Sequence, residues 1–465
     1  MRTSSTPRPP KLRQRGIKKK SIRLWCIVAG AIISVSIFNI WRHHSRCSTS
    51  TAISIGEFTS RGITPLSDNM VAPKRKLVYI FPETHHTEVM GELKHVLIDG
   101  VERSSHLQLT EDPDHPEACW AVEFHRAAKD LVQAVRKSSM RRGKRMKELS
   151  QSESESLVTA DKTQRQSTSS TSSGWDLFLI DYSDDWYLDR PDVKRILRNL
   201  SSVVGPEHVH VATRSTVVGR GAGPYFQKPY DEATPFSVGV KANYDQIVST
   251  YTSGILKHLH YPVRTDLVEE MESILRTNYS TSNSAIIVDP VDLPRPKDVA
   301  HFWKAGVRFA KLRDRVNMAM ERLNKENGNT MRMTTDEVGT ANIAGRNFAQ
   351  SEYAHQLLQH KIVVVCQRDT WEGHYRLMEA LSSGAMVLSD FMHFLPENLE
   401  DGKSIVIYTS LSDLKEKIMY YLGHPEERIR IARLGRKIAL EKHRSWHRME
   451  EILVRDWNDT KSEIL

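Results

Sequence analysis

Residues 361–390 read KIVVVCQRDTWEGHYRLMEALSSGAMVLSD and decide the fold. Residues 362–366 form a short, β-branched apolar run, which is typical of a strand buried on both faces. After a polar turn, apolar residues recur at helical spacing, and Gly384 closes the helix. Residues 385–388 form a second apolar run. The stretch therefore predicts a strand–helix–strand unit of a parallel sheet, whose ligands lie at the carboxyl ends of the strands.

Two charged residues inside the predicted helix indicate its chemistry. Arg376 and Glu379 are three positions apart, so they share one face of the helix. On an arbitrary helix such a pair is a solvated salt bridge, and that alternative stays open. Here the helix starts where a buried strand ends, so its amide groups and dipole favour an anion. A guanidinium there suits a diphosphate, and a carboxylate one turn on suits sugar hydroxyls.

The run WEGHYRLMEALSSG at residues 371–384, followed by AMVLSD, carries a family resemblance. It resembles the nucleotide-sugar segment of GT-B glycosyltransferases, in the R-x-x-E-A-x-x-x-G form of glycosyl transferases group 1-like and exostosin-like proteins. The resemblance implies that Glu379 holds the donor ribose and that Arg376 is a phosphate or structural partner. Gly373 and Glu372 join the predicted donor site. The commoner GT-B pattern has two glutamates separated by seven residues, whereas six separate Glu372 and Glu379.

Alternating strand and helix patterns extend over the rest of the body and predict an α/β chain of two Rossmann-like, doubly wound domains. The first, the acceptor domain, is expected at 75–270, and the second, which binds the nucleotide sugar, at 284–441. A C-terminal helix is expected at 442–465. Residues 120–135 have a helical apolar stripe. The composition of 137–174 predicts a disordered insert, whose basic residues could bind an acidic glycan or phospholipid.

The net charge of +9 is confined to the N-terminus, because residues 1–23 carry nine Lys and Arg and no Asp or Glu. The body is neutral, so nucleic acid is not an expected partner. Residues 24–41 are uncharged and mostly apolar, long enough to span a bilayer. We predict a cytosolic tail at 1–23, a signal anchor at 24–41 and a stem at 42–74. The chain would be a single-pass type II protein of the Golgi or ER membrane with a lumenal body; a cleaved signal peptide and an organellar presequence are the alternatives.

Further candidates come from residues that follow predicted strands or lie near the predicted cleft. Asp184, Asp185 and His85 are candidates for an acceptor base. Arg346, Arg295 and Lys297 are candidates for additional phosphate ligands. The scheme needs no metal and no cofactor besides the donor sugar nucleotide. The Asp-x-Asp at residues 112–114 follows no convincing strand, so we interpret it as a solvated loop.

The predicted function is a glycosyltransferase that moves a sugar from a nucleoside diphosphate sugar to a glycan or glycoprotein acceptor in the secretory pathway. One alternative is a non-catalytic GT-B-like protein that binds glycans or serves as a scaffold. Another is a lumenal sulfotransferase, which would need a phosphate loop directly after its first strand. Residues 81–86 read FPETHH and contain no Gly or Lys, which disfavours the sulfotransferase.

Overall fold

The computed structural model describes residues 75–81, 93–124, 129–157, 175–181, 191–213, 217–218, 232–236, 240–241, 255–279, 288–303, 311–335, 349–367, 372 and 375–454. The predicted tail, anchor and stem all lie outside these residues. Within the described ranges, no helix combines the length and the apolar character that crossing a membrane requires.

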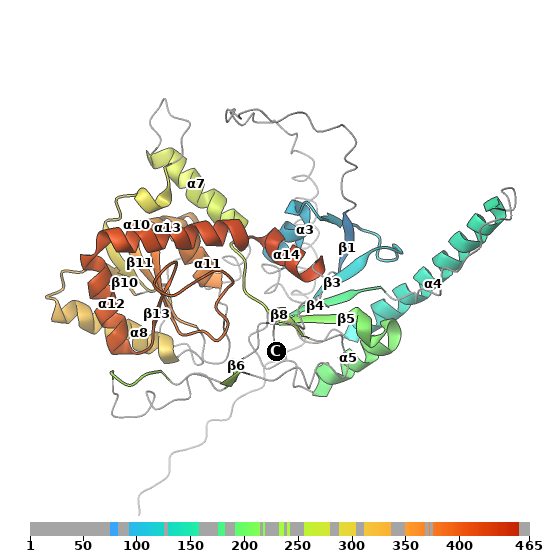
Figure 1. Ribbon diagram of the computed structural model, residues 1–465, viewed down its shortest axis with the longest axis horizontal. Coiled ribbons are helices and arrows are strands. Elements are labelled where there is room, and N and C mark those ends of the chain that lie inside the picture. Colours follow the sequence, from blue (N-terminus) through green and yellow to red (C-terminus); the bar gives the residue numbers. More distant parts are fainter. Residues whose placement is uncertain are drawn as a thin grey trace, which may run out of the picture. The chain divides into compact units, whose positions relative to one another are not determined.

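The first sheet has six strands in the described residues, in the order β2-β1-β3-β4-β5-β8, and all neighbours run parallel (Figure 1). The strands are β1 (Lys76–Phe81), β2 (Leu107–Leu109), β3 (Cys119–Glu123), β4 (Leu177–Asp181), β5 (Val209–Thr213) and β8 (Ile255–His258). A separate antiparallel pair is formed by β6 (Val217–Val218) and β7 (Val240–Lys241). The parallel order with a central β3 is that of a doubly wound sheet.

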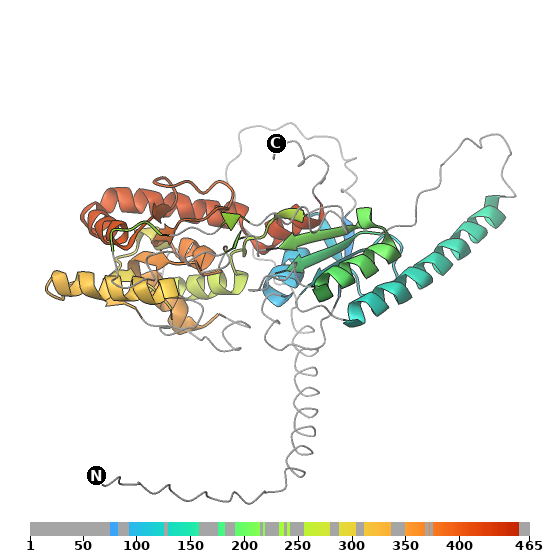
Figure 2. The same cartoon turned by 90° about the horizontal axis from the view of Figure 1, so that it is seen from below.

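Helices cover both faces of this sheet. One face packs against α4 (Lys129–Leu157) and α5 (Pro191–Val204) around the Trp120 and Trp175 rings, and Figure 2 shows these two helices on the same side of the strands. The other face packs against η1 (Leu93–Ile98), α3 (Asp99–Arg103) and the last described helix, α14 (Ser445–Leu453). A short 3₁₀ turn, η2 (Pro206–His208), leads into β5.

Two sequence predictions in this half are wrong. Residues 120–123 are part of β3 rather than of a helix, because the strand is central and all five of its residues are buried. Residues 137–157 are not disordered but continue α4. The buried Arg142 fixes that helix: it lies over the Trp175 ring and donates hydrogen bonds to the carbonyls of Pro113 and Ala118.

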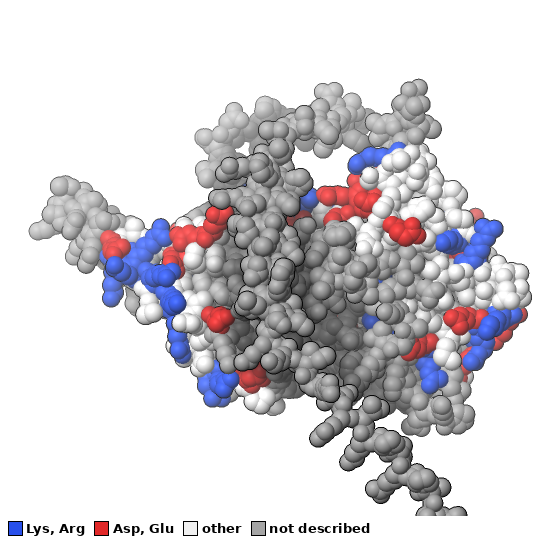
Figure 3. Space-filling view, turned by 180° about the vertical axis from the view of Figure 1, so that it is seen from behind, with Lys and Arg blue, Asp and Glu red and all other residues white. Residues whose placement is uncertain are grey.

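Besides the buried Arg142, α4 carries a strip of exposed basic side chains. Its Lys and Arg side chains gather along the helix in Figure 3. Two of them pair with the predicted solvated loop, Arg141 with Asp114 and Arg145 with Asp112, at 3.1 and 2.8 Å. The exposed members of the strip are Arg136, Lys137, Arg141, Lys144, Arg145 and Lys147.

The second sheet has five strands in the described residues, in the order β10-β9-β11-β12-β13, again all parallel. They are β9 (Lys297–Ala300), β10 (Met333–Thr334), β11 (His360–Val365), β12 (Met386–Asp390) and β13 (Val406–Tyr408). One face packs against α7 (Thr265–Tyr279), α10 (Ser351–Gln359) and α11 (Tyr375–Ser382). The other packs against α8 (Lys311–Glu326), α12 (Leu411–Gly423) and part of α13 (Pro425–Lys442). A 3₁₀ turn, η4 (Pro290–Asp292), precedes β9.

The core assignments move one predicted boundary. Leu259 and Tyr261 belong to the core of the first sheet, whereas Val263 and Leu267 belong to that of the second. The first domain therefore ends near residue 262, and the predicted boundary at 270 falls inside α7. An α/β fold with two parallel, helix-covered sheets fits the GT-B arrangement that the resemblance implies.

The strand–helix–strand unit predicted for residues 361–390 is present as β11, α11 and β12. β11 lies between β9 and β12 at the centre of the second sheet. Gly384 ends the helical segment with φ +77°, and a Cβ there would lie 2.9 Å from the backbone nitrogen of Val291. Glycine is required at this position, because the close approach of η4 and the left-handed backbone both exclude a side chain.

Candidate functional site

The carboxyl ends of β9, β11 and β12 form the edge of the second sheet at which the sequence predicts a ligand. The segment after β9 contains Trp303, and Gln367 follows β11. Asp390 ends β12, and its Oδ1 accepts the backbone N–H of Gln367 at 3.0 Å. This hydrogen bond joins the carboxyl ends of β11 and β12, the two strands that α11 connects.

Arg376 lies in the first turn of α11 and is 7% exposed. Its guanidinium carbon lies 4.9 Å from the centroid of the Trp303 ring and 5.0 Å from that of Tyr353. The Tyr375 ring is also close, at 5.7 Å. Three aromatic rings therefore hold this cation in place at the carboxyl edge through cation–π attraction.

Arg313, near the start of α8, is a second buried cation at the same edge, and the sequence analysis missed it. Its guanidinium carbon lies 3.3 Å from the centroid of the Trp303 ring, and its Nε donates to the carbonyl of Cys366 at 3.2 Å. It is 5% exposed. Arg313 and Arg376 thus share one indole ring, which gives the edge two fixed positive charges from different helices.

The charges of Arg313 and Arg376 both act on one neighbouring side chain, His301. This side chain, at the end of β9, is fully buried, and its Nδ1 lies 2.5 Å from Oδ1 of Asn317. Burial and the charges of Arg313 and Arg376 together lower the pKa of His301 to about 3, against the opposing hydrogen bond with Asn317. A positive potential of this kind attracts an anionic group.

Glu379 lies one turn beyond Arg376 and is 2% exposed. Its Oε2 accepts the Tyr353 hydroxyl at 2.8 Å, and its Oε1 lies 3.9 Å from a guanidinium nitrogen of Arg264. Burial raises the pKa of Glu379, while Arg376 and Arg264 oppose that rise. The predicted ribose ligand therefore sits in a buried polar network in the structure, joined to α10 through Tyr353.

Arg264 extends this network to the start of α7. It forms a bidentate pair with Asp266, at 3.0 and 2.6 Å, and Asp266 accepts the backbone N–H of Ala349 at 2.6 Å. Arg264 could not be predicted, because nothing in its local sequence pattern distinguishes it from a solvated arginine. Its position in the segment that leads from one sheet to the other is what brings it to Glu379.

Glu372 is fully buried, and its carboxylate accepts the backbone N–H groups of His393 and Phe394, at 2.8 and 3.0 Å. It holds the loop after β12 in place. Because both oxygens bind backbone groups of that loop, the structure gives Glu372 a positioning role.

Arg295 and Lys297 are not brought to this edge, and the prediction that they bind the donor phosphates is corrected. They lie before and at the start of β9, which is the amino end of a parallel strand. Arg295 donates to the carbonyls of Leu357, His360, Pro290 and Ser383, at 2.6–2.9 Å. Lys297 donates to Oε1 of Gln356 at 2.6 Å. Arg295 therefore ties backbone segments together at the opposite end of the sheet.

The remaining predicted residues fall outside the part of the chain that the structure describes. These are the candidate bases Asp184, Asp185 and His85, and the candidate donor ligands Gly373 and Arg346. They stay predictions. Among the described residues, no group of three or more His, Cys, Asp or Glu side chains is arranged to hold a metal ion.

A family model described as "Glycosyl transferase-like" matches residues 318–454. The matched segment contains β11, α11 and β12 with Arg376 and Glu379. The glycosyltransferase part of the resemblance is thereby confirmed over these residues. A search of the curated proteins found no match.

Solved structures give similarities at low identity. The C-terminal domain of a glycosyl transferase group 1 family protein (LpcC) from Francisella tularensis is 14% identical, with a TM-score of 0.26 over 40% of this chain and 95% of that one. HepE of Anabaena in complex with UDP is 10% identical, with a TM-score of 0.36 over 83% of this chain and 100% of that one. TarM is 13% identical, with a TM-score of 0.35 over 73% of this chain and 54% of that one.

Proposed function

We propose that the chain is a glycosyltransferase that uses a nucleoside diphosphate sugar. The observation that supports this most directly is the pair of buried guanidiniums, Arg313 and Arg376, fixed around Trp303 at the carboxyl end of a parallel sheet. Arg376 lies within residues 318–454, which match the glycosyl transferase-like family model, and Trp303 and Arg313 lie shortly before that segment. A diphosphate suits two fixed cations, because its charge is spread over several oxygens.

In the proposed reaction the bond between the anomeric carbon and the diphosphate oxygen breaks, and its electron pair leaves with the diphosphate. The acceptor hydroxyl oxygen forms the new bond to the anomeric carbon, and its proton passes to a base. Arg376 and Arg313 stabilise the negative charge that develops on the leaving diphosphate. Because they are already buried and held by aromatic rings, they need little rearrangement when that charge appears.

In the same proposal Glu379 binds the donor ribose. Since the carboxylate is 2% exposed and holds the Tyr353 hydroxyl, a ribose hydroxyl would take the place of that hydroxyl on binding. Asp184, Asp185 and His85 remain the candidates for the acceptor base in an inverting reaction. We propose further that the reaction is metal-independent, with the two arginines neutralising the diphosphate. Full activity in EDTA is the expected result.

The proposed acceptor is a glycan or glycoprotein, and the proposed location is the Golgi or ER membrane with a lumenal body. The basic residues 1–23 and the apolar residues 24–41 support this topology. Protease protection of the full chain in intact microsomes tests it: the body should be protected and the tail cleaved. Digestion of the body in sealed vesicles would contradict a lumenal location.

The test of the function is nucleotide binding followed by transfer. The purified full chain is titrated with UDP, GDP, CDP, ADP and adenosine 3′,5′-bisphosphate, and then supplied with the matching sugar nucleotide and mixed glycan acceptors. Selective binding of one nucleoside diphosphate, with sugar transfer, supports the proposal. Binding of the bisphosphate alone would favour a sulfotransferase, and a folded chain that binds glycans but no nucleotide would favour the scaffold alternative.

A further inference from the structure

A second cationic pocket lies at the opposite end of the second sheet from Arg376. It has a volume of about 390 Å³ and is lined by Val291, Leu293, Pro294, Arg295, Pro296, Lys361, Gly384, Arg428, Ile429 and Ala432. Arg295, Lys361 and Gly384 lie before or at the start of β9, β11 and β12. Parallel strands place these positions at one edge of the sheet, the amino edge, so the pocket is distinct from the proposed donor site.

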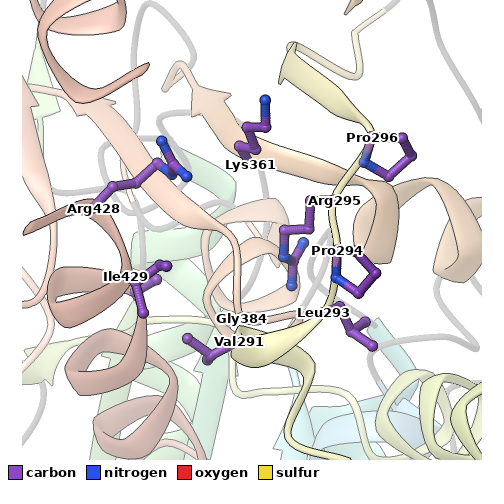
Figure 4. A pocket seen from close by; sticks show the side chains of 10 residues that line it. Val291, Leu293, Pro294, Arg295, Pro296, Lys361, Gly384, Arg428 and Ile429 are labelled. Atoms are coloured by element: carbon purple, nitrogen blue, oxygen red, sulfur yellow. The ribbon is translucent and has the colours of Figure 1, made fainter. Parts of the chain in front are cut away.

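The pocket concentrates positive charge. Figure 4 shows Arg428 entering from α13 on one side and Arg295 from the segment before β9 on the other, with Lys361 nearby. Of the three cations, Lys361 pairs with Asp298 at 2.6 Å. Within the described residues neither Arg295 nor Arg428 forms an ion pair, since their hydrogen bonds go to backbone carbonyls. Among the described residues, no carboxylate forms a direct ion pair with either guanidinium, although Asp289 and Asp298 act on them at longer range.

The charge of Arg428 also acts on Arg295. Burial, with a smaller contribution from the nearby charges of Arg428 and Arg436, lowers the pKa of Arg295 to about 9, although Asp289 and Tyr279 oppose the shift. An anion beside a buried guanidinium favours its charged form and so opposes this lowering. Arg428 uses its Nη1 for the Tyr421 carbonyl at 2.8 Å, and its other nitrogens hold no hydrogen bond within the described part of the chain. They can donate to a ligand.

The remaining walls restrict the class of ligand. Val291, Leu293 and Ile429 supply apolar wall, and Pro294 and Pro296 lie on the same side as Arg295 in Figure 4. A volume of this size falls at the lower end of small-molecule sites in proteins. A site that combines cations with apolar walls suits a phosphate group joined to a compact, less polar body.

We propose that this pocket binds a small phosphate-bearing molecule, with Arg428, Lys361 and the charge of Arg295 holding the phosphate. The inference goes beyond the proposed transferase function and does not depend on it. The pocket wall includes Gly384, directly after the segment that carries Arg376 and Glu379, and Arg295 donates to the neighbouring Ser383 carbonyl at 2.6 Å. A ligand here would therefore contact the far end of the helix that forms the proposed donor site.

The test uses inorganic phosphate as the probe, measured by equilibrium dialysis of radiolabelled phosphate against the purified full chain at low ionic strength. Arg428→Gln and Lys361→Gln remove pocket cations. Lys361 is half-exposed, so its variant keeps the test valid even when Arg428→Gln folds poorly. Arg430→Gln is the matched control, because Arg430 is exposed on the same helix and does not line the pocket. Arg376→Gln removes a cation of the donor site instead.

We expect Arg376→Gln and Arg430→Gln to retain phosphate binding at the pocket. Arg428→Gln and Lys361→Gln should each weaken it at least about tenfold, as loss of a charge-assisted hydrogen bond does. The proposal is overturned when the wild-type chain binds no phosphate. It is equally overturned when binding disappears in Arg376→Gln and persists in both pocket variants, since the phosphate would then occupy the donor site.

Discussion

Replacing Glu379 with glutamine separates the functional role of this carboxylate from a structural one. Burial raises the pKa of Glu379 above its ordinary value, so the folded protein holds its proton more tightly than the unfolded chain. Between about pH 4.5 and the raised folded value, the wild-type stability contributed by this group falls as pH increases. Glutamine cannot titrate and avoids that loss. At pH 7.5, Glu379→Gln should therefore unfold at a denaturant concentration no lower than the wild type.

The affinity for the donor, unlike the stability, should fall in Glu379→Gln. A hydrogen bond to a charged group contributes about 1.5–3 kcal/mol, so replacing the carboxylate should weaken nucleotide affinity by about 10- to 100-fold. Tyr353→Phe is the matched comparison. It removes the 2.8 Å hydrogen bond to the buried carboxylate without removing the carboxylate itself. It should cost about 1.5–3 kcal/mol of stability and leave donor affinity no weaker than in the wild type, because the ribose hydroxyl then has no tyrosine hydroxyl to displace.

The assays are denaturant unfolding of the full chain at pH 5, 6 and 7.5, and isothermal titration with the nucleotide identified for the wild type. The difference in unfolding free energy between Glu379→Gln and wild type should grow in favour of the variant as pH rises. A loss of more than about 2 kcal/mol in Glu379→Gln at pH 7.5 would refute the reasoning, because it would make the carboxylate a required partner of buried arginines. Unchanged nucleotide affinity would remove the ribose assignment.

Three further predictions concern the stability of the fold. Arg295→Met should destabilise the protein by about 3 kcal/mol or more in denaturant unfolding, because several backbone carbonyls lose their donor; a loss below about 1 kcal/mol would contradict its structural role. Gly384→Ala should cost about 2 kcal/mol or more, whereas Gly423→Ala, which has open space, should be nearly neutral, and equal effects would contradict the requirement at Gly384. Lowering the pH from 6.5 towards 4 should destabilise the fold, because histidines take up protons in the unfolded chain but stay neutral when buried in the folded one. The loss should be roughly 3 kcal/mol for one such residue, and an unfolding free energy that stays constant over this pH range would contradict the prediction. Burial lowers the pKa of each of these histidines, to about 3 or 4: His301, His360 and His443.

The strand–helix–strand unit was predictable because its signals are local. A β-branched run marks β11, and a glycine with positive φ marks the end of α11. The apolar residues of 351–359 recur at helical spacing, and these residues form α10. Ser410 caps α12 as its spacing from Asp413 predicts, accepting that residue's N–H at 3.0 Å.

The failures occur where the deciding contacts are distant in sequence. The strand β9 is four residues long with two buried, too short to stand out, and without it Arg295 could not be placed at the amino edge. Arg313 lies on a helix with many charges, and only the Trp303 ring, from another element, distinguishes it. In α4 the polar composition suggests disorder, while the buried Arg142 and its contacts with Trp175 and Pro113 stabilise the helix.

The most direct measurement of the central claim is the affinity of the folded full chain for nucleoside diphosphates, compared among wild type, Arg376→Gln, Arg313→Gln and the exposed control Arg430→Gln. If two buried guanidiniums around Trp303 hold the donor diphosphate, one nucleotide binds selectively. Each buried-site variant should then weaken it by at least about tenfold, and the control should match wild type. Equal affinity in wild type and Arg376→Gln, or no nucleotide binding by the folded wild-type chain, would contradict the claim.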